Sequence, residues 1–423
     1  MSKHDEEVLL PGPSPLTGSQ WWQIFAASWS QNCAESLTWK FFRGLLLAFG
    51  VFQTFYEEQL LPQKSTSQLA WISTISAFIL LASGLVTGPL FDNGYLRPLL
   101  VAGSLLEVFG VMMLSLSTEY YQVLLSQGIC IGLGSGMIFV PSLSAVAVSL
   151  DDARRAKVIG LASSTTGIGG IVYPIIFRQL VTSIGFRWAI RAIAFIMLTL
   201  FLLASPVLYV YKPNRNGLIR SWIDASAFKD MPFISILCGA VFSAMVFYLP
   251  MLYLPLYGTT AAHIQYTSVA FYLVSIANGA SVFGRLLCGF VATAIGPVET
   301  CALAIASSTV LLFCWFAVSS PAGVIVWSIA WGFISSAIVA LPGAIVPRVT
   351  PTLRLVGTRT GMLWTAVGVG MLIGSPIAGA LIETGDGYNH WWRAQLFASL
   401  SMTVSTAFFV YPALYVRRKR TEV

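Results

Sequence analysis

The sequence predicts an all-α membrane protein with twelve transmembrane helices in two six-helix halves. Three observations predict this class: the composition, the number of apolar runs and the placement of the charged residues. Hydrophobic residues make up 56% of the 423 residues and charged residues only 10%, whereas soluble domains have about 25% charged residues. So little polar surface cannot cover the two or three soluble domains that this length would otherwise suggest.

Twelve apolar runs are long enough to cross a bilayer, which takes about 20 residues for a hydrocarbon core of about 30 Å. They lie at 41–61, 69–91, 96–117, 121–149, 157–182, 187–211, 233–257, 268–293, 298–319, 321–346, 357–382 and 391–416. The long polar connection after the sixth run divides them six and six. We therefore predict a disordered cytosolic tail at 1–20, an N-terminal half at 21–211, a central cytosolic loop at 212–232, a C-terminal half at 233–416 and a basic tail at 417–423.

Basic residues predict the orientation of these spans. With twelve spans, the loops on the side of the termini carry Arg97, Arg154, Arg155, Lys157, Lys212, Arg215, Arg220, Lys229, Arg348, Arg354, Arg359 and the run 417–420. The opposite loops carry little beyond Lys64, Arg187 and Arg393. Cytosolic loops are enriched in Lys and Arg, so we expect both termini in the cytosol, with the plasma membrane as the site and the vacuolar membrane as the alternative. The net charge of +7 is then a topology signal, and no nucleic-acid partner is expected.

The first span is irregular. A continuous helix from Trp21 to Glu57 would be about 55 Å long at 1.5 Å per residue, nearly twice the bilayer core of about 30 Å. One interpretation is an interfacial helix at 20–30 followed by a span from Phe41. The favoured one is a gene-model artefact within 31–40, because removing this polar stretch joins two apolar runs into one normal span.

The turn after the second run carries a family pattern. It resembles the G-x-x-x-D-[RK]-x-G-[RK] loop between the second and third helices of major facilitator superfamily transporters. Gly88, Asp92 and Arg97 keep the pattern, while Asn93 replaces the usual basic residue. The resemblance implies a conformational latch at these three residues. Thr293 stands at the corresponding place in the second half, so we expect the loop-closing ion pairs to be stronger in the N-terminal half.

Other stretches are similar to the monocarboxylate-porter branch of that superfamily, in its fungal form. The resemblance runs from about Ala48 to Val416; its most specific parts are 154–162, 185–188 and 283–285. It implies a secondary active transporter of a small organic anion or metabolite, working by alternating access, with proton-coupled symport as one form. The alternatives are an efflux transporter for a fungal secondary metabolite and, in another class, a non-transporting nutrient sensor. Small molecules and the lipid bilayer are the expected partners, and the protein is expected to be a monomer.

Charged residues at membrane depth are costly and usually functional, which makes four of them candidates. Arg285 keeps the family's arginine and can hold a carboxylate in a bidentate manner, so we predict a substrate-binding or gating role. The family's acid four residues earlier is Ser281 here, which leaves the proton carrier unassigned. Glu107 is a proton carrier if burial neutralises it, and otherwise half of a buried ion pair with Arg178 or Arg191. The two arginines can also extend to the outer surface.

Polar and aromatic residues within the spans complete the predicted site. Asn278, Ser281 and Tyr173 are candidate polar groups of a cavity, and Trp331 and Trp364 could line one for a planar ligand or simply pack between helices. The glycines at 128, 132, 134 and 136 predict close helix packing. The sequence has no Cys-x-x-Cys pair, catalytic triad or nucleotide loop, so we expect no catalytic residue, metal or cofactor and no enzymatic activity.

Overall fold

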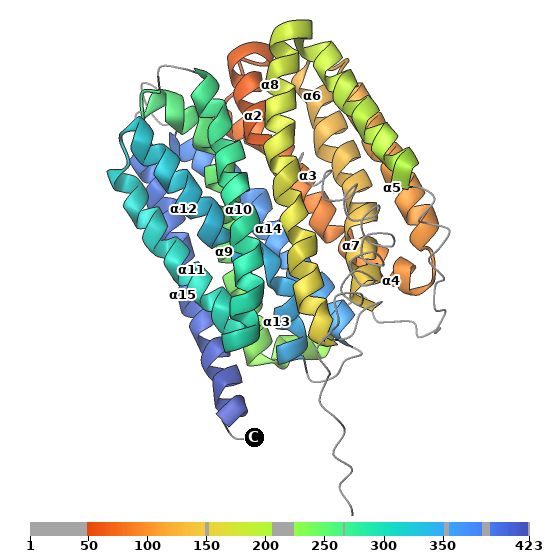
Figure 1. Ribbon diagram of the computed structural model, residues 1–423, viewed down its shortest axis with the longest axis vertical. Helices are drawn as coiled ribbons and strands as arrows, with labels where there is room; N and C mark the ends of the chain where they lie inside the picture. The colour runs from red at the N-terminus through yellow and green to blue at the C-terminus, as the bar shows by residue number, and fades with distance from the viewer. Residues whose placement is uncertain are drawn as a thin grey trace, which may run out of the picture.

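The computed structural model describes residues 49–148, 152–204, 224–264, 267–350, 355–382 and 390–421. The predicted tail at 1–20, the irregular stretch 31–40 and most of the central loop lie outside them. Every regular element in the described ranges is helical, and the helices run along one long axis, with those of the N-terminal half beside those of the C-terminal half (Figure 1). The predicted all-α membrane class is therefore confirmed.

The elements follow one another in a simple order. They are α2 (Phe49–Phe55), η1 (Tyr56–Leu60), α3 (Thr66–Ala82), α4 (Gly84–Asp92), α5 (Leu96–Leu114), α6 (Tyr120–Val123), η2 (Leu124–Ile131), α7 (Gly132–Val148), α8 (Asp152–Ala204), η4 (Ala225–Lys229), α9 (Met231–Thr260), α10 (Thr267–Ile295), α11 (Pro297–Cys314), η5 (Trp315–Ala317), α12 (Pro321–Ala340), α13 (Pro342–Val349), α14 (Val356–Ile382) and α15 (Trp391–Thr421).

Within the described residues, ten helical stretches are long and apolar enough to cross a membrane. One of them, Gly167–Leu203 in α8, has 37 residues and would be about 55 Å long as a straight helix. Gly185 breaks it with φ of 77° and ψ of 164°, a conformation that only glycine adopts readily. Figure 1 shows α8 turning back on itself, so this stretch supplies two spans, the predicted fifth and sixth.

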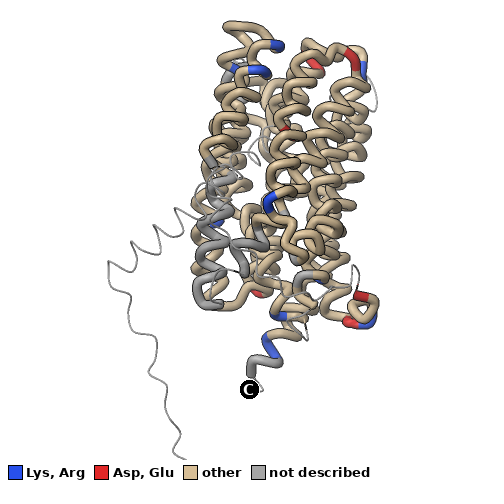
Figure 2. The backbone as a smooth tube through the Cα atoms, turned by 90° about the vertical axis from the view of Figure 1, so that its right-hand side faces the viewer, with Lys and Arg blue, Asp and Glu red and all other residues tan. Residues whose placement is uncertain are grey.

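Charged residues gather at the two ends of the bundle, and most of its length is apolar (Figure 2). We call the end that carries Arg97, Arg348 and Arg417 the basic end, and the other the opposite end. Helix α15 continues to Thr421, so part of the predicted basic tail is the last turn of a span. Arginines fit there because cations are stabilised at the C-terminus of a helix.

Glycines bring the helices of the N-terminal half close together. A Cβ on Gly132 of α7 would lie 3.0 Å from the Cα of Ser76 in α3, and one on Gly134 would lie 2.8 Å from the backbone nitrogen of Glu107 in α5. Contacts this short leave no room for a side chain. The prediction that these glycines serve close packing is confirmed.

The two halves touch toward both ends of the bundle. Toward the opposite end, Ser67 of α3 donates from Oγ to the carbonyl oxygen of Pro376 in α14 at 2.8 Å. Toward the basic end, the rings of Phe139 in α7 and Trp364 in α14 meet edge to face at 5.5 Å between centroids. The contact at each end must therefore break before that end can open.

Candidate functional site

The middle of the bundle holds a polar contact between α8 of the N-terminal half and α10 of the C-terminal half. Asn278 donates from Nδ2 to the carbonyl oxygen of Gly170 at 3.3 Å, and Ser275 donates from Oγ to that of Ile171 at 3.2 Å. A Cβ on Gly170 would lie 2.5 Å from Cγ of Asn278. The predicted site residue Asn278 is thus fully buried between the halves.

Ser281 and Arg285 follow Asn278 on the same face of α10, because positions three and seven residues on return to that face. Ser281 donates its hydroxyl to the carbonyl oxygen of Asn278 at 2.7 Å. The same hydroxyl would lie 3.2 Å from a Cβ on Gly167 of α8, so this face points toward α8. Arg285 lies roughly 10 Å from Asn278 along the helix toward the basic end and is only 4% exposed.

Glu107 and Tyr173 lie inside the N-terminal half. The Glu107 carboxylate is 1% exposed and accepts a hydrogen bond at Oε1 from the hydroxyl of Ser135 in α7 at 2.6 Å. Tyr173 of α8 is 1% exposed and interacts electrostatically with this carboxylate. Tyr173 also lies one turn beyond Gly170, so this predicted site residue stands on α8 beside the contact between the halves.

The alternative of an ion pair between Glu107 and Arg178 or Arg191 stays a prediction, and the structure gives both arginines other contacts among the described residues. Arg191 donates from Nε to the hydroxyl of Ser115 at 3.3 Å and lies 5.0 Å from the ring centroid of Trp188. Ser115 is eight residues, roughly 12 Å, from Glu107 along α5. Arg178 lies over the ring of Tyr272, 5.9 Å from its centroid. Arg191 is therefore held beside the end of α5, and Arg178 lies against a ring of α10.

The two predicted aromatic residues take different positions. Trp331 is fully buried inside the C-terminal half, where its ring stacks on Trp327 at 5.6 Å between centroids with an interplanar angle of 7°. Trp364 lies between the halves against Phe139. Neither indole nitrogen has a hydrogen-bond acceptor among the described residues. Trp364 is therefore the aromatic residue better placed to meet a ligand when the halves separate.

The predicted latch lies at the basic end. Helix α4, which contains Gly88, ends at Asp92, and Gly94 takes φ of 87° in the turn before α5. Arg97 is exposed on the first turn of α5. The side chain of Asp92 lies outside the described part of the structure, so the latch remains a prediction.

We expect Asp92→Asn to slow transport more than Thr293→Val, because only Asp92 can pair with a cation in its loop. Thr293 is exposed and donates its hydroxyl to the carbonyl oxygen of Phe290 in its own helix. Initial transport rates of the two variants, normalised to protein at the membrane, test this. Equal rates would remove Asp92 from the latch.

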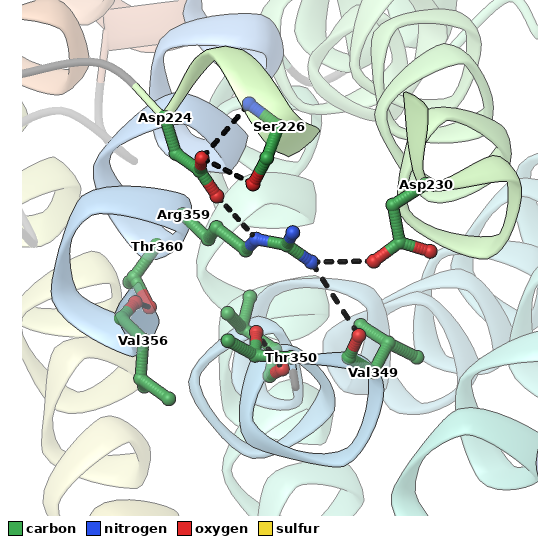
Figure 3. A network of polar contacts seen from close by, with 9 residues as sticks. Asp224, Ser226, Asp230, Val349, Thr350, Val356, Arg359 and Thr360 are labelled. Atoms are coloured by element: carbon green, nitrogen blue, oxygen red, sulfur yellow. Dashed lines mark hydrogen bonds and ion pairs between the residues drawn. The ribbon is translucent and has the colours of Figure 1, made fainter. Parts of the chain in front are cut away.

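The sequence patterns missed a buried ionic cluster at the basic end of the C-terminal half (Figure 3). Arg359 of α14 donates from Nε to Oδ2 of Asp224 at 2.9 Å and from Nη1 to Oδ2 of Asp230 at 2.6 Å. Its guanidinium lies 4.9 Å from the ring centroid of Phe233. We call Arg359, Asp224 and Asp230 the basic-end clamp, because they join the segment before α9 to the start of α14.

Two hydrogen bonds from Ser226 hold the Asp224 carboxylate in place, from its backbone nitrogen at 2.9 Å and from its hydroxyl at 2.5 Å. Burial acts to raise the pKa of the Asp224 carboxyl, but the bonds from Ser226 and Arg359 outweigh it and hold that pKa below its usual range. A lowered pKa stabilises the folded state above the unfolded value of about 3.9, and this contribution is lost only as the pH falls through the folded value. The clamp is therefore intact at neutral pH.

The signal of the clamp in the sequence is an arginine just inside an apolar run, together with two acids in an otherwise basic loop. From the sequence, Arg359 is only one of the basic residues that predict the orientation. The expectation that the stronger loop ion pairs lie in the N-terminal half is untested, but the C-terminal half has an ionic cluster of its own.

Apolar spans, two halves in contact toward both ends and buried polar groups between them define a multi-pass membrane transporter. The sequence model of the Major Facilitator Superfamily matches residues 41–341, and the chain belongs to that family. Family membership and transporter-named relatives make the protein a transporter and not an enzyme.

The chain is similar to three curated relatives in particular. It is 38% identical over 365 residues to the MFS-type transporter dbaD of Emericella nidulans, covering 86% of this chain and 80% of the relative. It is 34% identical to the Aspyridones efflux protein apdF of Emericella nidulans over 85% of this chain and 72% of the relative. It is 31% identical to the Fujikurins efflux protein of Gibberella fujikuroi over 99% of this chain and 86% of the relative.

Proposed function

We propose that this transporter exports a small organic metabolite from the cell. The observation that carries the proposal is the similarity to the Aspyridones and Fujikurins efflux proteins, the second of which aligns with 99% of this chain. Major facilitator proteins expose a midplane site to each side of the membrane in turn by rocking their halves. The contact of Asn278 with Gly170 lies between the halves at mid-span, where such a site is expected.

The direct test compares the metabolites in the medium and in the cells of cultures with and without the gene. Export predicts compounds that accumulate in cells lacking the gene and are depleted from their medium. A compound taken up more slowly without the gene would indicate import. No difference would overturn the export proposal and favour the nutrient sensor.

We propose that Arg285 binds an acidic or strongly polarised group of the exported compound. A guanidinium holds a carboxylate through two parallel hydrogen bonds, and burial strengthens such an interaction because the surroundings screen it poorly. We expect Arg285→Ala to reduce export at least tenfold while the protein still reaches the membrane. Arg285→Lys keeps the charge but loses the paired donors of the guanidinium, and should retain part of the activity. Export by the alanine variant at the wild-type rate would remove Arg285 from the site.

Import of a monocarboxylate together with a proton is the second candidate. Its support is the family pattern around Gly185 and Arg285. Ser281 stands at the position of the family's acid and donates its hydroxyl to its own helix. This position therefore has no carboxyl that could bind a proton. Uptake of labelled monocarboxylic acids by cells with and without the gene separates this candidate from export.

The proposed orientation of the protein in the membrane follows from its basic residues. The charge pattern supports an orientation with the basic end and both termini in the cytosol, and we propose a monomer in the plasma membrane. Cysteine labelling from outside, at Thr118 near the opposite end and at Thr293 near the basic end, tests the orientation. Labelling at position 118 alone is the result expected for a cytosolic basic end. Labelling at position 293 alone would show that the basic end faces outward.

A further inference from the structure

Glu107 is a carboxyl group deep in the membrane with half of its hydrogen-bonding capacity unused. It lies eleven residues, roughly 16 Å, from the basic end of α5 and is 1% exposed. Ser135 bonds to Oε1 at 2.6 Å, while no described residue offers a hydrogen bond to Oε2. In the basic-end clamp, by contrast, Asp224 and Asp230 both bond to Arg359.

The groups that face Glu107 from the neighbouring elements supply no described cation. Tyr173 faces it from α8, and Cys130 of η2 donates from Sγ to the carbonyl oxygen of the adjacent Leu106 at 3.4 Å. On the α7 side the described partner is the uncharged Ser135. Arg191 of α8 bonds to Ser115 near the opposite end, and Asp92, the acid of α4, has a side chain that is not described.

A carboxylate in such a place is costly when charged. Burying an ion without a counter-ion costs far more than burying the neutral group, so the group takes up a proton instead. Intramembrane acids that face other helices of the bundle serve as proton relays in pumps and transporters. Glu107 therefore has the chemistry of a proton-binding site, and no described group in its surroundings serves it as an ion-pair partner.

We propose that Glu107 carries the proton whose inward movement drives export. This inference rests on the proposed function, since it names the coupling ion of the same transporter. The proton binds to the carboxylate from the outer side and leaves to the cytosol as the metabolite moves outward. One proton enters per cycle, no bond of the metabolite changes and no other reactant is required.

Polar side chains lie between this carboxyl and the contact between the halves. Ser135 bonds to it directly, and Tyr173 lies one turn from Gly170, where Asn278 joins α8 to α10. Rocking of the halves must change that contact, because it ties one half to the other. The proposal therefore couples the protonation of Glu107 to the separation of α8 and α10.

Export from living cells tests the proposal. Cells carry wild type, Glu107→Gln, the matched control Glu119→Gln or no gene, and the compounds retained only in cells without the gene define the export assay. Glu119 is an exposed acid before α6, so its variant should behave as wild type. We expect Glu107→Gln to lower export at least tenfold, and any remaining export to resist a protonophore that stops the wild type. Wild-type export by Glu107→Gln, with unchanged protonophore sensitivity, would overturn the proposal.

A spectroscopic test separates this inference from the export proposal. Infrared difference spectra of the purified full-length protein in lipid bilayers report the C=O stretch of protonated carboxyl groups, which carboxylates lack. We expect a protonated-carboxyl band at neutral pH that disappears on alkalinisation, is absent from Glu107→Gln and is kept by Glu119→Gln. If no compound depends on the gene, the export proposal fails while this band still reports on Glu107. A band that is identical in wild type and Glu107→Gln would overturn the proton-binding role.

Discussion

Arg359→Ala is expected to destabilise the folded protein by about 3–5 kcal/mol, the usual cost of removing one partner from a buried ion pair. Two carboxylates would then face each other's charge without the guanidinium, and the side chain of Asp224 is only 7% exposed. The midpoint of thermal unfolding in detergent, followed with a thiol-reactive dye or by loss of the monodisperse peak, measures the effect. Arg348→Ala is the matched control because Arg348 is exposed at the same end, and its variant should stay within about 0.5 kcal/mol of wild type.

A double-mutant cycle separates the clamp from simple loss of an arginine. Asp224→Asn, Arg359→Gln and the double variant should show a coupling of about 0.5–3 kcal/mol, since residues in one ionic network are not additive. The double variant should recover part of the stability because no uncompensated charge remains at that pair. Strictly additive changes, or an Arg359→Ala protein as stable as the Arg348→Ala control, would contradict the clamp.

Gly374→Ala is the second large effect that we expect. A Cβ at this position of α14 would overlap the backbone carbonyl oxygen of Met245 in α9, which cannot rotate away as a side chain could. Forcing an extra carbon into a close-packed contact costs about 1–3 kcal/mol. The same thermal unfolding assay should therefore show a clearly lowered midpoint and less protein at the membrane.

Gly289→Ala is the control for that substitution. Gly289 lies within α10, and a Cβ there would meet nothing within 4 Å. Alanine should be neutral or stabilise the helix by about 0.5–1 kcal/mol, because it is the better helix former. Equal midpoints for the two variants would mean that α9 and α14 move apart at little cost, against the close contact at Gly374.

The comparison between these glycines also shows what sequence patterns can and cannot resolve. The run from Gly128 to Gly136 indicates packing correctly, since small residues at helical spacing let helices approach. Gly289 lies four residues before Thr293, as Gly88 lies four residues before Asp92. A Cβ on Gly289 would nevertheless meet open space, whereas one on Gly374 would meet backbone. Which glycine matters depends on the rotation of each helix about its axis, and the spacing alone does not fix that rotation.

The sequence by itself determined that this protein is a helical membrane transporter of the major facilitator type. The transporter type followed from the resemblance of the motifs to those of the family. The bilayer dictates the helical spans physically: its apolar thickness sets the length of each run, and it excludes unpaired backbone groups, so that helices are required. The same constraint is enough to place Glu107 and Arg285 within spans, because both lie inside apolar runs of spanning length.

Only the tertiary structure decided which side chains meet. Asn278 bonds to Gly170, 108 positions away along the chain, and Arg359 to Asp224, 135 positions away, while Glu107 accepts a hydrogen bond from Ser135. Such pairings follow from how two helices are turned and how far they slide past each other. The spacing of apolar residues does not determine the rotation of a helix about its axis or its shift along that axis, because many rotations and shifts bury the same apolar face equally well.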